Sequence, residues 1–132
     1  YDASEADIKD KPNWPVIECV IAMYEQGAEV IFMSGREDKY REQTERFINQ
    51  WVNVDYFNPH ANPKTLVEPM PHKLYMRSTG DTRKDCIVKQ ELFEEHIAGK
   101  YNVLFVLDDR QQVVRQYRSM GLTVFQVDEG QF

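Results

Sequence analysis

The chain has 132 residues, which is long enough for one domain with its own hydrophobic core, and its net charge at pH 7 is −6. An acidic surface repels polyanions, so this charge excludes a protein that coats nucleic acid regardless of sequence, although a local basic pocket can still grip a terminal phosphate. Cys19 and Cys86 lack metal-binding spacing, and no apolar run approaches the ~20 residues of a membrane span. We therefore expect one soluble, cytoplasmic domain over residues 1–132 with no membrane partner.

The first half of the chain predicts two helices separated by a strand. The first helix begins near Asn13-Trp14-Pro15, because proline suits a first turn, and ends at Gly27. Residues 28–33 predict a short strand that ends at Ser34-Gly35-Arg36. From residue 37 a second helix follows, and helical spacing places five side chains on its buried face: Tyr40, Thr44, Phe47, Ile48 and Trp51. Residues 57–72 contain four of the six prolines and predict an irregular loop.

The second half alternates strands and helices. Residues 73–78 predict a strand, and Asp81 or Thr82 can cap a third helix that runs to about residue 97. Residues 103–107 are five consecutive apolar residues, which suits a strand buried on both faces. A fourth helix ends at Gly121, and residues 122–127 form the last strand. This alternation predicts an α/β fold with a parallel sheet between helices.

Residues with chemical potential follow the ends of these elements. Ser34, Gly35 and Arg36 can together bind phosphate, because serine and the backbone donate hydrogen bonds, glycine permits close approach and arginine offers a charged fork. The alternative is a tight turn that ends in a surface arginine.

Asp85 and Lys89 are four residues apart and therefore share one helix face. On spacing alone they form an exposed ion pair worth only ~0.3–0.5 kcal/mol. The functional alternative places Lys89 on a bound phosphate, with Asp85 holding its ammonium group in position.

Asp108 and Asp109 follow the apolar run directly, at the strand end where open α/β sheets bind ligands. Adjacent carboxylates repel each other, so a site that keeps both ionised commonly holds a cation, and hard oxygen ligands suit Mg²⁺. The alternative is one helix cap and one solvated acid.

Three segments together resemble a known family. Residues 30–37 (VIFMSGRE), 80–89 (GDTRKDCIVK) and 107–114 (LDDRQQVV) resemble the second, third and fourth motifs of haloacid-dehalogenase-like phosphohydrolases. More narrowly, they are similar to the phosphatase domain of phage polynucleotide kinase-phosphatases, over residues 1–132. The resemblance implies a three-layer, Rossmann-like fold with a parallel sheet.

The activity implied by this resemblance is a Mg²⁺-dependent phosphomonoesterase that removes a 3′-phosphate from DNA or RNA ends. Ser34, Gly35 and Arg36 would hold the transferring phosphate. Lys89 would neutralise the phosphate, and Asp85 would position Lys89.

The resemblance also implies a metal site and further contacts. Asp108 and Asp109 would complete the magnesium site, and Arg83 and Lys84 would contact the nucleotide. The expected partners are a 3′-phosphorylated nucleic-acid end and a kinase or ligase domain in the parent protein.

One motif of the family has no counterpart in the sequence. The reaction begins with an aspartate nucleophile in an Asp-x-Asp-Gly-Thr motif, whose first Asp forms a phospho-aspartyl intermediate and whose second serves as acid and then base. That motif is absent here, so we expect an N-terminally incomplete domain, inactive alone. In the family, the central strand that carries the nucleophile lies between the strands ending at residues 33 and 107. A continuous ladder between those two would refute this missing-strand hypothesis.

Two other functions fit the same residues. A phosphatase of this superfamily that acts on a small metabolite is mildly favoured by the acidic charge. The second alternative is a module that binds phosphate without catalysis. A receiver-like signalling domain fits less well, because it has its acid pair at the first strand and its lysine at the last, and Asp108 and Asp109 here follow Lys89.

Overall fold

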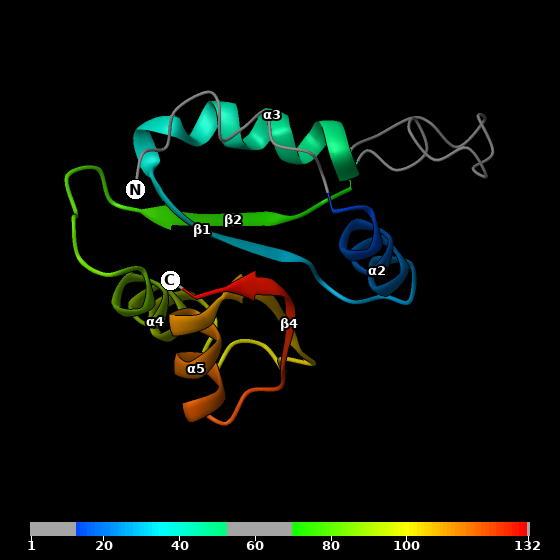
Figure 1. Cartoon of the computed structure of the whole chain (residues 1–132). Helices are drawn as coiled ribbons and strands as arrows, with labels where there is room; N and C mark the ends of the chain where they lie inside the picture. The colour runs from blue at the N-terminus through cyan, green and yellow to red at the C-terminus, as the bar shows by residue number, and fades with distance from the viewer. Residues whose placement is uncertain (1–12, 53–69, 132) are drawn as a thin grey trace.

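The computed structural model describes residues 13–52 and 70–131, and over these ranges it confirms an α/β fold with parallel strands (Figure 1). Most of the predicted loop, residues 57–69, lies outside the described residues, as does the side chain of Trp51. In chain order the elements are α2 (Trp14–Glu25), β1 (Ile31–Glu37), the 3₁₀ turn η1 (Asp38–Tyr40), α3 (Arg41–Val52), β2 (Lys73–Arg77), α4 (Asp85–His96), β3 (Val106–Arg110), α5 (Gln111–Ser119) and β4 (Val124–Gly130).

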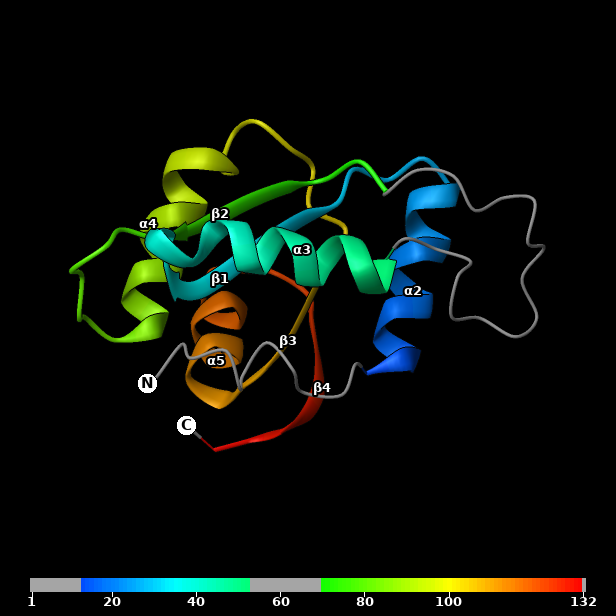
Figure 2. The ribbon, with the colours of Figure 1, turned by 90° about the horizontal axis from the view of Figure 1, so that it is seen from above.

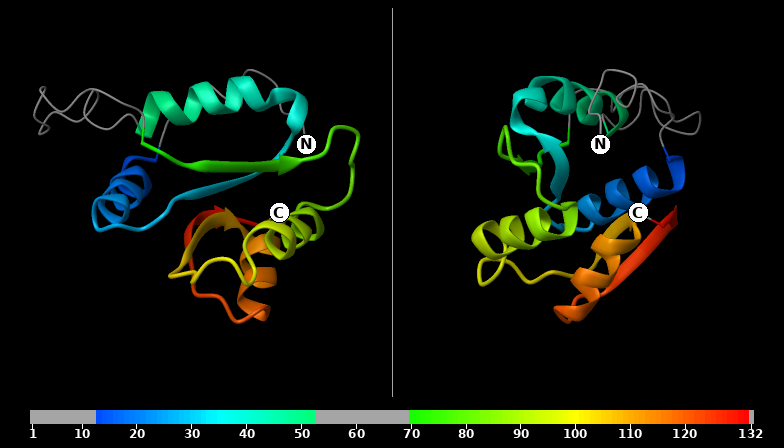
Figure 3. Two further views of the ribbon diagram at one scale, coloured as in Figure 1. Left: turned by 180° about the vertical axis from the view of Figure 1, so that it is seen from behind. Right: turned by 60° about the vertical axis from the view of Figure 1, so that its left-hand side comes forward.

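The strands form two separate parallel ladders. β1 pairs with β2 and β3 pairs with β4, and within the described residues β1 and β3 do not pair with each other. Figure 1 and, from behind, Figure 3 show the β1–β2 pair apart from the β3–β4 pair. The missing-strand hypothesis predicts this separation, because the family's central strand would lie between β1 and β3.

Each ladder has its own apolar cluster. α3 covers one face of the β1–β2 pair and α4 lies on the other side, while α2 lies where β1 begins (Figures 1 and 2). Side chains from α3, from β2 and from Met70, three residues before β2, form the first cluster: Ile48, Val52, Met70, Leu74 and Met76. The second cluster joins α5 to β4, through Val113, Val114, Tyr117 and Val124. The fold thus consists of two packed halves, and α4 contacts both of them, through β1 and β2 in the first and α5 in the second.

The boundaries of β1 and β4 differ from the prediction. β1 runs to Glu37 rather than ending at residue 33, because its pairing with β2 resumes after a register shift between Ser34 and Glu37. The Ser34-Gly35-Arg36 segment is therefore a bulge within the strand, a feature that re-aims side chains. β4 begins at Val124 rather than at residue 122, in register with Val106.

The prediction for residues 103–107 was wrong in position and in burial. β3 is Val106–Arg110, so the two aspartates lie inside the strand and residues 103–105 precede it. None of the five apolar residues is buried, and Leu104 is 58% exposed. The physical reason is that the side of this segment facing β1 has no neighbouring strand in the described part of the chain.

The predicted start of the third helix was also wrong. α4 begins at Asp85, because the carboxylate of Asp81 instead accepts a hydrogen bond from the backbone N–H of Arg83 and closes a local turn. The other helices begin and end close to their predicted residues, α2 at Trp14 and α5 before Gly121. In the described ranges, no helix has the length and apolar character needed to cross a membrane.

Candidate active site

A buried carboxylate, that of Asp85, lies at the centre of the candidate site. Asp85 is the first residue of α4 and is 6% exposed. Its oxygens lie 3.4 Å from Arg77 Nη2, 3.4 Å from Lys89 Nζ and 3.6 Å from Arg110 Nη1. These cations offset the cost of burying the negative charge. Because they come from β2, α4 and β3, Asp85 links the two ladders near the carboxyl ends of their strands.

Lys89 lies between two carboxylates. Its Nζ donates a hydrogen bond to Asp108 Oδ2 at 3.1 Å and lies 3.4 Å from Asp85 Oδ2, and its side chain is 11% exposed. The spacing of Asp85 and Lys89 thus predicted a real contact, but the exposed-pair interpretation was wrong because both side chains are buried. A buried ammonium held by two acids is preorganised to meet an anion.

Gly35 is required by the protein itself. A Cβ at this position would lie 2.0 Å from Asp85 Oδ1, far inside contact distance. The sequence predicted that glycine permits close approach of a phosphate, and the structure places the Asp85 carboxylate against it. The absence of a side chain at residue 35 therefore lets β1 and the start of α4 meet.

Ser34 and Arg36 shape the bulge next to Gly35. The Ser34 hydroxyl oxygen accepts a hydrogen bond from the Arg36 N–H at 3.1 Å, as the tight-turn interpretation expects. Within the described residues, the Arg36 guanidinium forms no ion pair. Arg36 lines a cavity of about 290 Å³, so its charge is available there. Five basic and three acidic residues line that cavity: Arg36, Arg77, Arg83, Lys84 and Arg110, with Glu37, Asp81 and Asp85.

The two aspartates of β3 differ in their surroundings. Asp108 Oδ2 accepts a hydrogen bond from Lys89, and Asp108 Oδ1 accepts one from the Arg110 N–H at 3.0 Å. Asp109 is exposed. Across the described ranges, no group of three or more His, Cys, Asp or Glu side chains is placed to hold a metal ion. The metal role of Asp108 and Asp109 stays a prediction.

Arg83 and Lys84, the expected nucleotide contacts, differ in whether an acidic side chain pairs with them. Arg83 lies 2.8 Å from Asp81 and 2.5 Å from Glu91. Its guanidinium lowers the pKa of Asp81 to about 2 and also lowers the pKa of Glu91. Lys84 is exposed at the start of α4 and, among the described residues, forms no ion pair. Of the two, Lys84 is better placed to meet a ligand.

Sequence reasoning missed three residues of this site. Arg77 and Arg110 both contact Asp85, and a single arginine at a strand end has no signal that separates it from a surface charge. The Tyr117 hydroxyl donates to Met33 Sδ at 3.6 Å and so joins α5 to β1. Burial raises the pKa of Tyr117, and the charges of Asp108 and Asp85 add to the effect.

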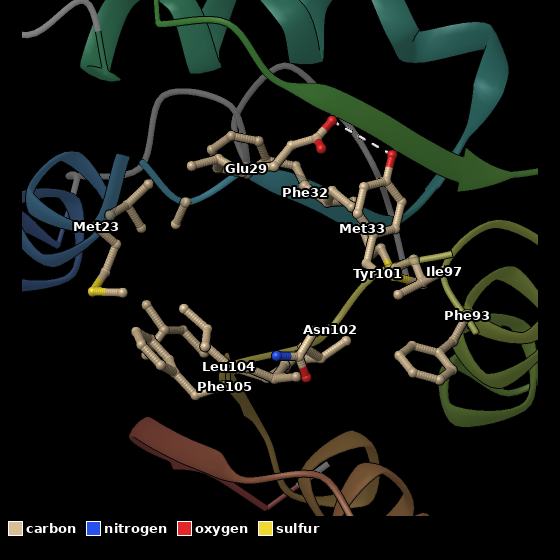
Figure 4. A pocket seen from close by; sticks show the side chains of 18 of the residues that line it. Met23, Glu29, Phe32, Met33, Phe93, Ile97, Tyr101, Asn102, Leu104 and Phe105 are labelled. Carbon is tan, nitrogen blue, oxygen red and sulfur yellow. Dashed lines mark hydrogen bonds between the residues drawn. The ribbon is translucent and has the colours of Figure 1, made fainter. Parts of the chain in front are cut away.

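A larger, mostly apolar groove of about 620 Å³ separates the two ladders (Figure 4). One wall is residues 28–33 of β1 and the turn before it, and the facing wall is residues 101–108. At one end the Tyr101 hydroxyl donates to Glu29 Oε1 at 3.4 Å, across the groove. The groove also reaches Asp108, so it opens onto the candidate site.

Comparison with known proteins identifies relatives along the whole sequence. Residues 1–132 match the family model described as the polynucleotide kinase PNKP phosphatase domain. A putative bifunctional polynucleotide kinase/RNA ligase of Autographa californica nuclear polyhedrosis virus is 33% identical over 129 residues. That match covers 96% of this chain and 16% of the viral protein.

Solved structures agree with the sequence comparison. A chain from the structure of a Pnkp1/Rnl/Hen1 complex is 42% identical, with a TM-score of 0.77 over 95% of this chain and 38% of that chain. A chain from the Pnkp1/Rnl/Hen1 RNA repair complex is also 42% identical, with a TM-score of 0.78 over 95% of this chain and 35% of that chain. The chain therefore spans between about a sixth and two fifths of the relatives it matches.

Proposed function

Because the chain belongs to the family of polynucleotide kinase PNKP phosphatase domains, we propose that it removes the 3′-phosphate from broken nucleic-acid ends during RNA repair. The observation that carries this proposal is Lys89, whose ammonium group lies between Asp85 and Asp108 while Gly35 abuts the same Asp85 carboxylate. This arrangement brings together one residue or more from each of the three motifs that resemble haloacid-dehalogenase-like phosphatases.

In this proposal the phosphate lies between Lys89 and the β1 bulge. The Lys89 ammonium neutralises negative charge that develops on the transferring phosphoryl group. The Ser34 hydroxyl, whose oxygen accepts the Arg36 N–H, still has its own proton to donate to a phosphate oxygen. Arg36 adds a charge from the neighbouring 290 Å³ cavity. These groups bind and orient the phosphate.

The two aspartates of β3 would hold Mg²⁺. This ion commonly takes one or two protein carboxylates together with water and substrate phosphate oxygens, so a donor set of Asp108 and Asp109 fits it once substrate is bound. When bound, Mg²⁺ would withdraw charge from the phosphate oxygens. Lys89 and the Arg110 N–H orient the Asp108 carboxylate for that role through their hydrogen bonds to its two oxygens.

The nucleophile would arrive on a strand that fills the 620 Å³ groove. β1 and β3 each have one ladder partner among the described residues, so both can accept a further strand on the groove side. The walls are mostly apolar, which suits a central strand, and the groove ends at Asp108. A strand that ended there in Asp-x-Asp-Gly-Thr would place its first carboxylate beside Lys89 and the magnesium ligands. In this proposal the described residues supply the phosphate clamp, and the incoming strand supplies the attacking group.

A nucleic-acid end is favoured over a small metabolite by the basic cavity. The cavity lies beside the phosphate clamp in a protein whose net charge is −6, and Arg36 and Lys84 form no ion pair in the described part of the chain. A local concentration of positive charge suits the backbone phosphate that precedes a terminal 3′-phosphate. A sugar phosphate has no such second phosphate to bind.

The relatives suggest how the activity is used. The viral relative is a putative kinase and ligase, and the structural relatives come from complexes named for Pnkp1, Rnl and Hen1. We propose that this phosphatase likewise acts with kinase and ligase domains. Removal of a 3′-phosphate leaves a 3′-hydroxyl, the group that a ligase must join to a 5′-phosphate.

Phosphate release by the full-length protein tests the proposal. With Mg²⁺ present, the initial rate should be much higher on a 3′-phosphorylated oligonucleotide than on ribose phosphates at equal concentration, and EDTA should stop both. A higher rate on ribose phosphates would instead support the small-metabolite function. Binding of vanadate without any turnover would support a non-catalytic phosphate-binding module.

A further inference from the structure

The Arg77 guanidinium contacts Gly35, Asp81, Arg83 and Asp85, although β2 carries none of the predicted motif residues. Its Nε donates to the Gly35 carbonyl at 2.8 Å. Its Nη1 donates to the Asp81 carbonyl at 3.0 Å and to the Arg83 carbonyl at 2.5 Å. Its Nη2 lies 3.4 Å from Asp85 Oδ1, and the side chain is 11% exposed.

These contacts use the particular shape of a guanidinium. Arginine presents five N–H donors in a fixed plane, whereas lysine presents one nitrogen with rotating protons. The four acceptors of Arg77 lie on three segments: the bulge of β1, the turn before α4 and the first residue of α4. One rigid group therefore fixes the relative position of three pieces of chain.

We infer that Arg77 is a positioning residue of the phosphate clamp, and this inference rests on the proposed function of that site. Arg77 holds Asp85 against Gly35, and Asp85 in turn holds the Lys89 ammonium. Its own donors face carbonyl and carboxylate oxygens of the protein, whereas Arg36 is left to meet the ligand. Arg77 thus acts on the phosphate through Lys89.

The test compares Arg77→Lys and Arg77→Met with Arg118→Met in the full-length protein. Arg118 is a matched control, because it also donates to a carbonyl, that of Val124 at 3.0 Å, but lies on the far half of the fold. On a 3′-phosphorylated oligonucleotide, both Arg77 variants should lower kcat about 100-fold and leave KM and its salt dependence nearly unchanged. Arg118→Met should keep both constants.

A direct contact with nucleic acid would give the opposite pattern and overturn the inference. In that case Arg77→Met would raise KM, reduce the salt dependence and leave kcat unchanged, and Arg77→Lys would restore binding because a point charge suffices. Failure of lysine to rescue, together with a loss in kcat, supports the need for a planar fork.

Amide hydrogen exchange tests the same inference without reference to activity. Substitution of Arg77 should speed exchange in residues 34–37 and 81–86, because these segments lose their common anchor, and Arg118→Met should not. Unchanged exchange there would overturn the positioning role even in an active enzyme. If the wild type released no phosphate, the proposed function would fail, and the exchange result would still decide the role of Arg77. Arg77→Lys supplies both measurements if Arg77→Met does not fold.

Discussion

Replacing Gly35 by alanine is the smallest change that should disable the candidate site. Gly35 has no positive backbone φ, so alanine is compatible with its conformation. The added methyl group instead meets the Asp85 carboxylate, which three cations hold in place. The effect of this substitution therefore reports on how tightly β1 and α4 are fitted together.

The size of the effect follows from two distances. The new Cβ would lie 2.0 Å from Asp85 Oδ1, and ordinary contact begins at 3.4 Å, so the carboxylate must retreat by about 1.4 Å. Overpacking and the weakened pairing of a buried charge together should lower the free energy of unfolding by about 3 kcal/mol. A displacement of this size near the reacting group should lower kcat by about 100-fold.

Denaturant unfolding and phosphate release measure the two effects in the full-length protein. Gly99→Ala is the control: Gly99 has open space around its Cβ position, so its positive φ adds only backbone strain, and kcat should not change. In an Asp85→Ala background, where the obstructing carboxylate is gone, Gly35→Ala should cost less than about 1 kcal/mol. Equal costs in both backgrounds would refute the steric explanation.

Three further predictions test other parts of the site. Asp108→Asn should abolish the stimulation of turnover by Mg²⁺ in a metal titration, and a normal Mg²⁺ response would remove Asp108 from the metal site. Arg83 lowers the pKa of Asp81 from 3.8 to about 2, so the stability from this pair is complete above pH 4 and is lost as the pH falls toward 2. Asp81→Asn should therefore lose less thermal stability than wild type over that interval. Parallel plots of melting temperature against pH for the two proteins would contradict this. Leu104→Asp should lower the melting temperature of the full-length protein, although Leu104 is 58% exposed here, because the proposed strand would cover it; an unchanged melting temperature would count against a strand in the groove.

The sequence predicted elements well where local signals agree. Trp14 and Pro15 marked the start of α2, and Gly121 marked the end of α5. Residues 103–107 were misjudged because an apolar run reports a preference for burial, and burial requires neighbours. β3 pairs with β4 on one side, and no described strand lies on its other side to complete the burial.

The sequence predicted many of the residues of the candidate site, but it did not predict how they contact one another. Helical spacing placed Asp85 and Lys89 on one face, but only the fold reveals that this face is buried against β1 and β3. Arg77 could not be found from its neighbours in the sequence, because its partners are carbonyl groups, which any residue possesses. Gly35 was correctly predicted to permit a close approach, but the group that approaches it is the Asp85 carboxylate and not a phosphate.

Phosphate release from a 3′-phosphorylated RNA oligonucleotide by the full-length Lys89→Met variant tests the phosphate clamp most directly. Lys100→Met is the matched control, because Lys100 is exposed, lies beyond the far end of α4 and donates to the Glu95 backbone carbonyl. We predict that Lys89→Met lowers kcat by about 1000-fold, since it removes the cation that faces the phosphate, and that Lys100→Met leaves kcat unchanged. A Lys89→Met variant that releases phosphate as fast as wild type would contradict the assignment of this site.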